Sequence, residues 1–296
     1  MNADQLPILY HDAALVVVNK PAGLVVHPNP YTRREPTCIN ILGGRLHARV
    51  HVVHRLDRGT SGLLVLALTP GAARDLASQF QAGGTPAGRP SPGGVPADGL
   101  SPGGYPAGSA PAGGVRKQYL ALVRGRPEPE GLVSAPLSTR DGGEPAEAAT
   151  RYTLLASSEL QEPVGPYPAA RVSLVRLELL TGRYHQARRH LRYLDHPVLG
   201  DRRYGDRFYN RFLAGRLGGT LFLHCSLLEI RHPSSGAALR AEAGPPDPWR
   251  RAFDLLGLEP PQGLFTEPRV QLAPGGPAPR SRDAGEDAPG GGQVHQ

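Results

Sequence analysis

Two apolar runs on either side of a short charged segment constrain the fold of this 296-residue chain more than any other feature. Valines dominate residues 50–53, and residues 63–68 are Leu-Leu-Val-Leu-Ala-Leu. Runs of this kind predict β-strands, and the Gly and Ser residues between them predict a turn. We therefore expect the connecting segment, residues 54–62, to place its single carboxylate, Asp57, at the end of a strand and over a groove.

The residues around Asp57 suit a charged catalytic group. Arg55 and Arg58 flank it, and Arg55 and Asp57 share one face if the segment is extended. A carboxylate held among guanidinium groups stays ionised at neutral pH, which fits a nucleophile or an electrostatic catalyst better than a general acid. A hairpin with a surface salt bridge would explain the same residues, because short motifs produce many false matches.

Two further segments carry candidate functional residues. Tyr119 lies in an apolar run that begins at Lys117 and predicts a strand, where an ordinary core Tyr would also fit. Later, Thr181 and Gly182 end an alternating run that predicts another strand. A short helix with apolar residues at helical spacing is expected over residues 71–80, between the Asp57 segment and Lys117.

An arginine-bearing helix is expected from about residue 184 to 194. On such a helix His185, Arg188 and Arg192 share a face that can meet a phosphate or a carboxylate. A metal site built from His185 and His190 is not expected, because a spacing of five residues separates them by roughly 140° around a helix. The helical zinc motif needs a spacing of four with a Glu between the two histidines.

Composition and charge narrow the function classes. The formal net charge is +7, and residues 181–216 hold nine Arg against three Asp, which favours an acidic partner such as nucleic acid. The two cysteines are far apart and form no C-x-x-C motif, so we expect no zinc or redox site. Neither a leader-like N-terminal segment nor an apolar run of membrane-spanning length is visible. We expect a cytoplasmic protein that does not enter a membrane.

Two segments have a biased composition. Residues 81–114 consist mainly of Gly, Pro, Ala and Ser, with Ser-Pro-Gly-Gly at 91–94 and again at 101–104. Such a segment buries too little apolar surface to offset its ordering entropy, so we expect a disordered insertion in a surface loop. An RNA-contacting arm is the alternative. It is less favoured, because the segment holds only one Arg and one Tyr. Residues 258–296 are expected to form a disordered tail.

Three motifs together resemble those of the RluA-type RNA pseudouridine synthases. Residues 54–62 are similar to the family signature, in the form His54-Arg55-Leu56-Asp57-x-x-Thr60-Ser61-Gly62. Lys117-x-Tyr119 and Gly182-Arg183-x-His185-Gln186-x-Arg188 are similar to the family's other two motifs. The three motifs follow one another in this chain in the same order as in the family. The resemblance extends over residues 9–256, apart from the insertion, and these residues would form one catalytic domain.

The resemblance implies a fold, an activity and a set of site residues. The fold is α+β, with a mixed, mostly antiparallel sheet, flanking helices and a central RNA-binding cleft. The activity is isomerisation of a uridine to pseudouridine in structured RNA, without a metal or other cofactor. Asp57, Tyr119 and Arg188 are implied as catalytic residues, with Arg188 as the partner of Asp57. The implied substrate-binding residues are Arg55, His54, Thr60, Arg183 and His185.

The resemblance also assigns roles within that reaction. Tyr119 would stack on the uracil and accept the proton that leaves, and Arg55 would fill the space that the flipped base vacates. The segment from Arg188 to Arg211 is most similar to a tRNA-modifying branch, so tRNA is the expected partner and ribosomal RNA the alternative. We expect the enzyme to act as a monomer.

Two other function classes fit parts of the sequence. A non-catalytic RNA-binding protein on the same scaffold would share the basic segment but would not need Asp57, Tyr119 and Arg188 together. A glycosidase breaks a similar bond, but it normally needs two carboxylates, and no second acidic residue stands out near Asp57.

Overall fold

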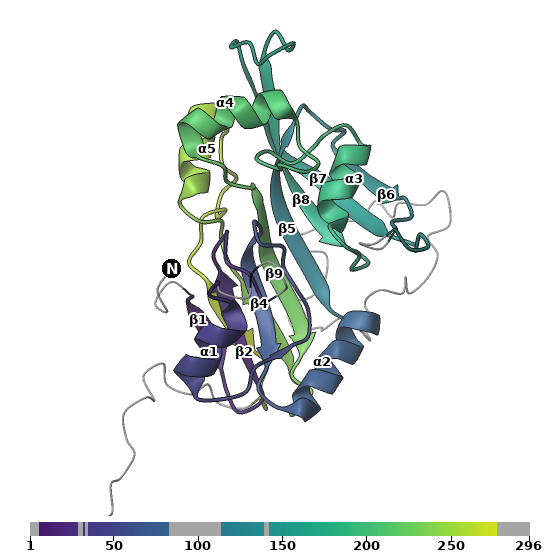
Figure 1. The fold of residues 1–296 in the computed structure, drawn as a ribbon, viewed down its shortest axis with the longest axis vertical. Helices are drawn as coiled ribbons and strands as arrows, with labels where there is room; N and C mark the ends of the chain where they lie inside the picture. The colour runs from purple at the N-terminus through teal and green to yellow at the C-terminus, as the bar shows by residue number, and fades with distance from the viewer. Residues whose placement is uncertain (1–5, 29–31, 33–34, 83–113, 139–141, 277–296) are drawn as a thin grey trace, which may run out of the picture.

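A computed structural model describes residues 6–28, 32, 35–82, 114–138 and 142–276 of the chain (Figure 1). Most of the expected insertion at 81–114 lies outside these residues, as does the tail beyond residue 276. The described part of the chain contains no helix with the length and apolar character that a membrane span requires.

One mixed sheet of eleven strands organises the molecule, with the order β1-β2-β4-β9-β5-β8-β7-β6 along its main path. All strand pairs are antiparallel except β4 and β9, which pair in parallel at Ser61 and Gly62. This confirms the expected α+β class. The strands are β1 Ile8–His11, β2 Leu15–Lys20, β3 His51–Val52, β4 Ser61–Ala67, β5 Arg116–Arg124, β6 Glu130–Ser134, β7 Ala149–Leu160, β8 Ala170–Leu179, β9 Leu223–Arg231, β10 Ala238–Glu242 and β11 Arg269–Leu272.

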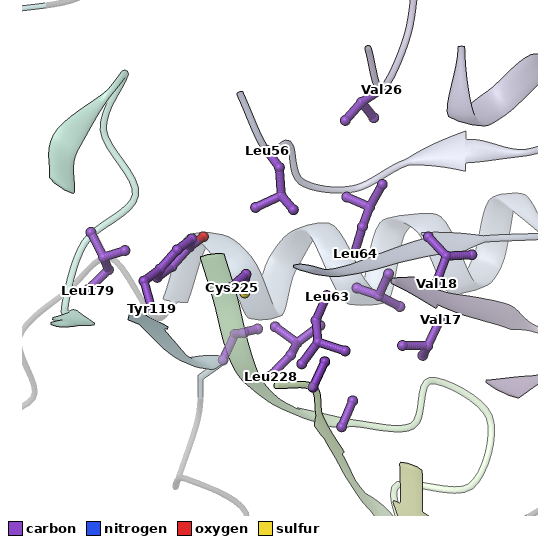
Figure 2. Packing of buried hydrophobic residues seen from close by; sticks show 14 of the residues in the cluster. Val17, Val18, Val26, Leu56, Leu63, Leu64, Tyr119, Leu179, Cys225 and Leu228 are labelled. Atoms are coloured by element: carbon purple, nitrogen blue, oxygen red, sulfur yellow. The ribbon is translucent and has the colours of Figure 1, made fainter. Parts of the chain in front are cut away.

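In the described part of the chain five helices flank the sheet, and two buried apolar clusters hold the layers together. Helices α1 and α2 lie toward one end of the molecule, α4 and α5 toward the other, and α3 lies beside β6, β7 and β8 (Figure 1). The larger cluster includes the apolar residues of β2, β4 and β9, with Tyr119 and Cys225 near one end of the labelled residues (Figure 2). The helices are α1 Cys38–Leu46, α2 Pro70–Ala82, α3 Gln186–Tyr193, α4 Arg207–Leu217 and α5 Pro248–Leu256.

The structure corrects several expectations about local structure. Strand β3 is only two residues long, so Asp57 lies in an irregular loop between β3 and β4 and not at a strand end. Helix α1 was not expected at all, although Thr37 caps it by accepting the N–H of Asn40.

Two element boundaries also differ from expectation. Helix α3 begins at Gln186 and not at 184, because His185 has a left-handed backbone with φ of 52°. The disordered tail expected from residue 258 is contradicted over residues 258–276, because Leu258 is buried and β11 pairs with β10. Val270 and Leu272 of β11 pack against the larger apolar cluster, which explains why this Pro-rich and Gly-rich stretch is held in place.

Gly62 is required where the Asp57 loop enters the sheet. It has a φ of +107°, and a Cβ at this position would lie 2.2 Å from the carbonyl oxygen of Cys225. We expect Gly62→Ala to lower the free energy of unfolding by about 3 kcal/mol, from the combined backbone strain and overlap. Urea denaturation measures this loss.

Gly44→Ala is the matched control for Gly62→Ala. Gly44 lies in α1, and a Cβ there would meet nothing within 4 Å. Ala in a helix interior is favoured over Gly by about 0.5–1 kcal/mol, so this variant should be as stable as the unmodified chain or slightly more stable. Equal stabilities of the two variants would contradict the assigned close approach between Gly62 and β9.

Candidate active site

The loop that carries Asp57 is fastened to the β2 turn by backbone hydrogen bonds. The N–H of Gly23 donates to the carbonyl of Arg58 at 2.7 Å, and the N–H of Thr60 closes a turn on the carbonyl of Asp57 at 3.1 Å. These bonds fix the backbone on both sides of the carboxylate. A loop can therefore position Asp57 as firmly as the strand end that the sequence predicted.

Lys20 is a buried anchor of the same loop. Its Nζ donates to three carbonyl oxygens, those of Pro21 and Leu24 at 2.9 Å each and that of Arg58 at 3.3 Å. Burial lowers the pKa of Lys20 to about 8. The sequence analysis did not single out Lys20. The Asn-Lys-Pro-x-Gly pattern at residues 19–23 was the feature that could have drawn attention to it.

Arg188 joins two carboxylates. Its Nη1 donates to Oδ2 of Asp57 at 2.9 Å, while its Nε and Nη2 donate to the two oxygens of Asp201 at 2.7 and 2.8 Å. Burial alone would lower the pKa of Arg188, but its hydrogen bonds to Asp201 and Asp57 outweigh burial and raise it. Arg188 is therefore a permanent positive charge at Asp57, in the pairing that the sequence resemblance implied.

Asp201 is the site residue that sequence reasoning missed. Its side chain is fully buried, and it also accepts the backbone N–H groups of Arg203 and Tyr204. Burial on its own would raise the pKa of Asp201, but the bonds from Arg188 and from these N–H groups lower it overall. Asp201 thus holds the Arg188 guanidinium in a bidentate grip and leaves Nη1 for Asp57.

His185 lies on the other side of the Asp57 carboxylate. Its Nε2 is 3.6 Å from Oδ1 of Asp57, its Nδ1 is 3.2 Å from the Tyr204 hydroxyl, and its ring stacks on Tyr184 at 3.7 Å. Burial lowers the pKa of His185 to about 4, so the ring is neutral at physiological pH. The positive charge at Asp57 therefore comes from Arg188, and His185 contributes shape and a neutral polar contact.

The expected common face of His185, Arg188 and Arg192 is only partly realised. His185 precedes α3, and the side chain of Arg192 is half exposed and 3.8 Å from Asp195. Only Arg188 turns fully inward. His190, on the same helix, uses both ring nitrogens, on Thr150 at 2.9 Å and on the carbonyl of Ala135 at 3.0 Å.

Tyr119 lies on β5 and is buried beside Cys225 (Figure 2). Burial, followed by the interaction with Cys225, raises the pKa of Tyr119 well above its ordinary value of 10.0. The side chain is therefore a neutral phenol at physiological pH. This state suits stacking on a base.

Asp57, Tyr119 and Arg188 line one cavity of about 540 Å³. Its wall also includes residues from α2, the Asp57 loop and the segment between β8 and α3. A second cavity, of about 870 Å³, shares Arg55, Asp57 and Arg188 with the first. The carboxylate of Asp57 is thus accessible from a hollow deep enough to receive a base.

Comparison with known proteins identifies the family to which the chain belongs. Residues 14–87 and 107–193 match the family model described as RNA pseudouridylate synthase. The chain belongs to this family. It is an RNA pseudouridine synthase, of the RluA type that the three motifs indicated.

Relatives within the family are similar over most of their length. The tRNA pseudouridine synthase C of Salmonella typhimurium is 36% identical over 85% of this chain and 90% of its own. The enzyme of that name from Pasteurella multocida is also 36% identical, over 86% of this chain and 96% of its own. The structure of human RNA pseudouridylate synthase domain containing 4 superposes with a TM-score of 0.60 at 26% identity, over 86% of this chain and 95% of that one.

In this pseudouridine synthase the five predicted substrate-binding residues occupy different depths. All five line the first cavity: Arg55, His54, Thr60, Arg183 and His185. Arg55 and Arg183 are exposed. Thr60 is buried, and its hydroxyl has no hydrogen-bond partner among the described residues. The cavity therefore has a basic rim and an inner wall with an unused hydroxyl.

His54 lies in the wall of the pseudouridine synthase cavity, where it contacts other parts of the protein. Its Nε2 accepts the N–H of Val65 at 3.0 Å, and its ring stacks on Phe80 at 4.3 Å. Burial, with a smaller contribution from Lys117, lowers the pKa of His54 to about 3, so the ring stays neutral. The geometry gives His54 a part in holding the loop against β4 and α2.

The site does not offer the second carboxylic acid that a glycosidase needs as its general acid. Asp201 is the acidic residue that Arg188 brings toward Asp57, but its lowered pKa keeps it ionised. An ionised carboxylate in a bidentate pair with Arg188 cannot act as the general acid that glycoside hydrolysis requires.

Proposed function

We propose that this pseudouridine synthase isomerises a specific uridine in tRNA, with Asp57 as the catalytic aspartate and the target base flipped into the first cavity. One observation carries the proposal: the carboxylate of Asp57 is held by Nη1 of Arg188 at 2.9 Å, in a cavity that Tyr119 also lines. A base inside a helix cannot reach such a site, so the nucleotide must leave its stack first.

The proposed reaction needs nothing beyond the RNA and this chain. The bond between N1 and C1′ breaks, the uracil turns, and C5 bonds to C1′. The proton that C5 loses balances the proton that N1 gains, so substrate and product have the same atoms. Asp57 is proposed to attack or to stabilise the sugar or the base during this exchange, and Arg188 keeps the carboxylate oriented.

Tyr119 is proposed to support the flipped base by stacking. A neutral phenol ring offers the same face as Phe, and base-aromatic stacking contributes about 1–3 kcal/mol. We therefore expect Tyr119→Phe to keep its single-turnover rate within about 3-fold of the unmodified enzyme and Tyr119→Ala to lose about 10-fold or more in that rate. A quench-flow assay with tritium release from C5 measures both rates, and equal rates for Phe and Ala would contradict the stacking role.

The choice of tRNA rests on the relatives and on the basic surface. Both bacterial relatives described above are named tRNA pseudouridine synthase C. Exposed Arg55 and Arg183 at the cavity rim can meet phosphates of any structured RNA, so RNA affinity should fall steeply with salt. Ribosomal RNA is the second candidate, because the catalytic residues would meet the same flipped uridine in either RNA.

The first cavity also argues against a non-catalytic RNA-binding protein. A pure RNA-binding protein would not need Asp57, Tyr119 and Arg188 in one hollow, and the family is one of enzymes. We propose that the protein acts in the cytoplasm as a monomer.

Unmodified transcripts test the proposed function. Purified protein is incubated with a tRNA pool transcript set and with ribosomal RNA fragments, in buffer containing EDTA, and pseudouridine is mapped at single-nucleotide resolution. The proposal predicts conversion of one uridine in tRNA. Conversion in ribosomal RNA alone would overturn the tRNA assignment, and no conversion in either RNA would overturn the activity.

A further inference from the structure

Lys117 is a buried cation on the wall of the first cavity. It lies on β5 two residues before Tyr119, is 7% exposed, and lines the cavity together with Tyr119 and Asp57. Its Nζ is 5.8 Å from the centre of the Phe80 ring, and a Cβ on Gly182 would lie 3.5 Å from it. The ammonium group is therefore placed between α2 and the segment that leads into α3.

No anionic group compensates this charge among the described residues. Lys117 forms no ion pair or hydrogen bond with them. The group whose charge would favour the protonated form of Lys117 is the thiol of Cys225. Burial raises the pKa of Cys225 to about 12, so that thiol is neutral. Burial also lowers the pKa of Lys117. Lys20 shows the contrast, because its buried Nζ has three carbonyl partners.

An ammonium on a largely buried side chain is unfavourable for folding when no anion or hydrogen-bond acceptor of the protein compensates it, because the ion loses part of its hydration. An apolar side chain of similar size would fill the same space at no such penalty. The position therefore makes physical sense if an acceptor enters the cavity with the substrate.

We propose that the Lys117 ammonium donates a hydrogen bond to a carbonyl oxygen of the flipped uracil and stabilises the negative charge that the base carries after its bond to the sugar breaks. This inference rests on the proposed function. It adds a base-contacting residue to Asp57, Tyr119 and Arg188, and it makes Lys117 a catalytic residue in the strict sense of touching the substrate.

The bond exchange creates a transient negative charge that such a group would stabilise. When the bond between C1′ and N1 breaks, its electron pair stays on the uracil, and the charge spreads over N1, O2 and O4. The charge disappears when C5 bonds to C1′, and C5 then loses a proton while N1 gains one, so that the product is neutral. A fixed cation in a water-poor site stabilises this transient anion more than the neutral base, which lowers the barrier.

The buried position favours the base over a phosphate as the ligand. Phosphates remain attached to the RNA backbone at the cavity mouth, where exposed Arg55 and Arg183 are available. The base is the part of the flipped nucleotide that enters deepest. Lys117 and Tyr119 lie two residues apart on one strand and both line the cavity, so a base stacked on Tyr119 presents its polar edge within reach of Lys117.

Lys117→Met tests the proposal, with Arg116→Met as the matched control. Arg116 is the preceding residue on β5, and its guanidinium pairs with Glu178 at 3.1 Å and Glu229 at 3.5 Å. We expect Lys117→Met to lower the single-turnover rate by about 10²-fold, to change the Kd for RNA by less than about 3-fold, and to melt at the same or a higher temperature. Arg116→Met should keep the rate and lose some stability.

Sulfur substitution separates a contact with the base from a structural role. The target uridine is replaced by 2-thiouridine or 4-thiouridine, because sulfur accepts a hydrogen bond more weakly than oxygen. The proposal predicts that one of these substitutions slows the unmodified enzyme but changes the rate of Lys117→Met by less than about 2-fold, since the two changes remove the same contact. Equal sulfur effects in both enzymes would overturn it.

The two levels of inference fail in different ways. Absence of pseudouridine in tRNA with the unmodified enzyme would overturn the proposed function. A normal unmodified enzyme together with an equally fast Lys117→Met variant would overturn the role of Lys117 alone.

Discussion

Asp57→Asn is expected to reduce pseudouridine formation by about 10⁴-fold or more in single turnover, as the loss of a reacting group does in other enzymes. The substitution changes the charge and almost nothing else. Asn can still accept the Nη1–H of Arg188, and Arg188 keeps its two bonds to Asp201. We therefore expect the melting temperature and the Kd for RNA to stay close to those of the unmodified enzyme.

Asp254→Asn is the control for this charge change. Asp254 is exposed on α5, outside both cavities. This variant should retain full activity and stability. An Asp57→Asn enzyme with a rate within about tenfold of the Asp254→Asn enzyme would show that the carboxylate of Asp57 does not react with the substrate.

Arg188→Ala is expected to remove activity and to destabilise the fold by about 3–5 kcal/mol, because it leaves the fully buried carboxylate of Asp201 without its cation. The backbone N–H groups of Arg203 and Tyr204 remain as partners of Asp201, but they carry no full charge. Chemical denaturation measures the stability, and single-turnover assays on the folded fraction measure the rate. Arg192→Ala, on the same helix but half exposed, should leave the stability within about 0.5 kcal/mol.

The loss of stability in Arg188→Ala should depend on pH. In the unmodified enzyme the pKa of Asp201 is below its ordinary value of 3.8, so its contribution to stability is present above that value and is lost as the pH falls through the lowered pKa. Without Arg188, burial dominates and raises the pKa of Asp201, and the variant gains stability as Asp201 takes up a proton. The stability difference should therefore be largest near neutral pH and shrink toward pH 4. A difference that is constant with pH would contradict the pairing of Arg188 with Asp201.

The resemblance to the family motifs singled out three candidate catalytic residues. Asp57, Tyr119 and Arg188 lie far apart in the chain, yet one cavity receives all of them. The pairing of Arg188 with Asp57 is present as the resemblance implied. The catalytic roles of these residues remain predictions that the substitutions above test.

The second carboxylate and the buried lysines could not be predicted in the same way. Asp201 sits in a turn-rich stretch, where an Asp is common for local reasons and nothing in the spacing shows its pair with Arg188. Lys20 and Lys117 belong to the Asn-Lys-Pro-x-Gly and Lys117-x-Tyr119 patterns, but neither pattern shows that its lysine is buried. Only the three-dimensional contacts show that Lys20 is fully satisfied and that Lys117 has no partner among the described residues.

Local structure was misjudged where tertiary contacts override the pattern. Valines at 50–53 predicted a strand that reaches Asp57, but β3 ends at Val52, and the chain is then fixed by turn bonds and by the ring of His54 on β4. Strand β11 was missed because its four residues are surrounded by Pro and Gly. Its pairing with β10 supplies the hydrogen bonds that a local pattern does not reveal.

Pseudouridine mapping of total cellular RNA tests the central claim most directly. RNA is compared from cells with the gene, without it, and with the gene restored as the unmodified or the Asp57→Asn form. The account predicts that one tRNA pseudouridine disappears without the gene, returns with the unmodified form, and stays absent with Asp57→Asn. Pseudouridine that returns with Asp57→Asn, or a map that does not change when the gene is removed, would contradict it.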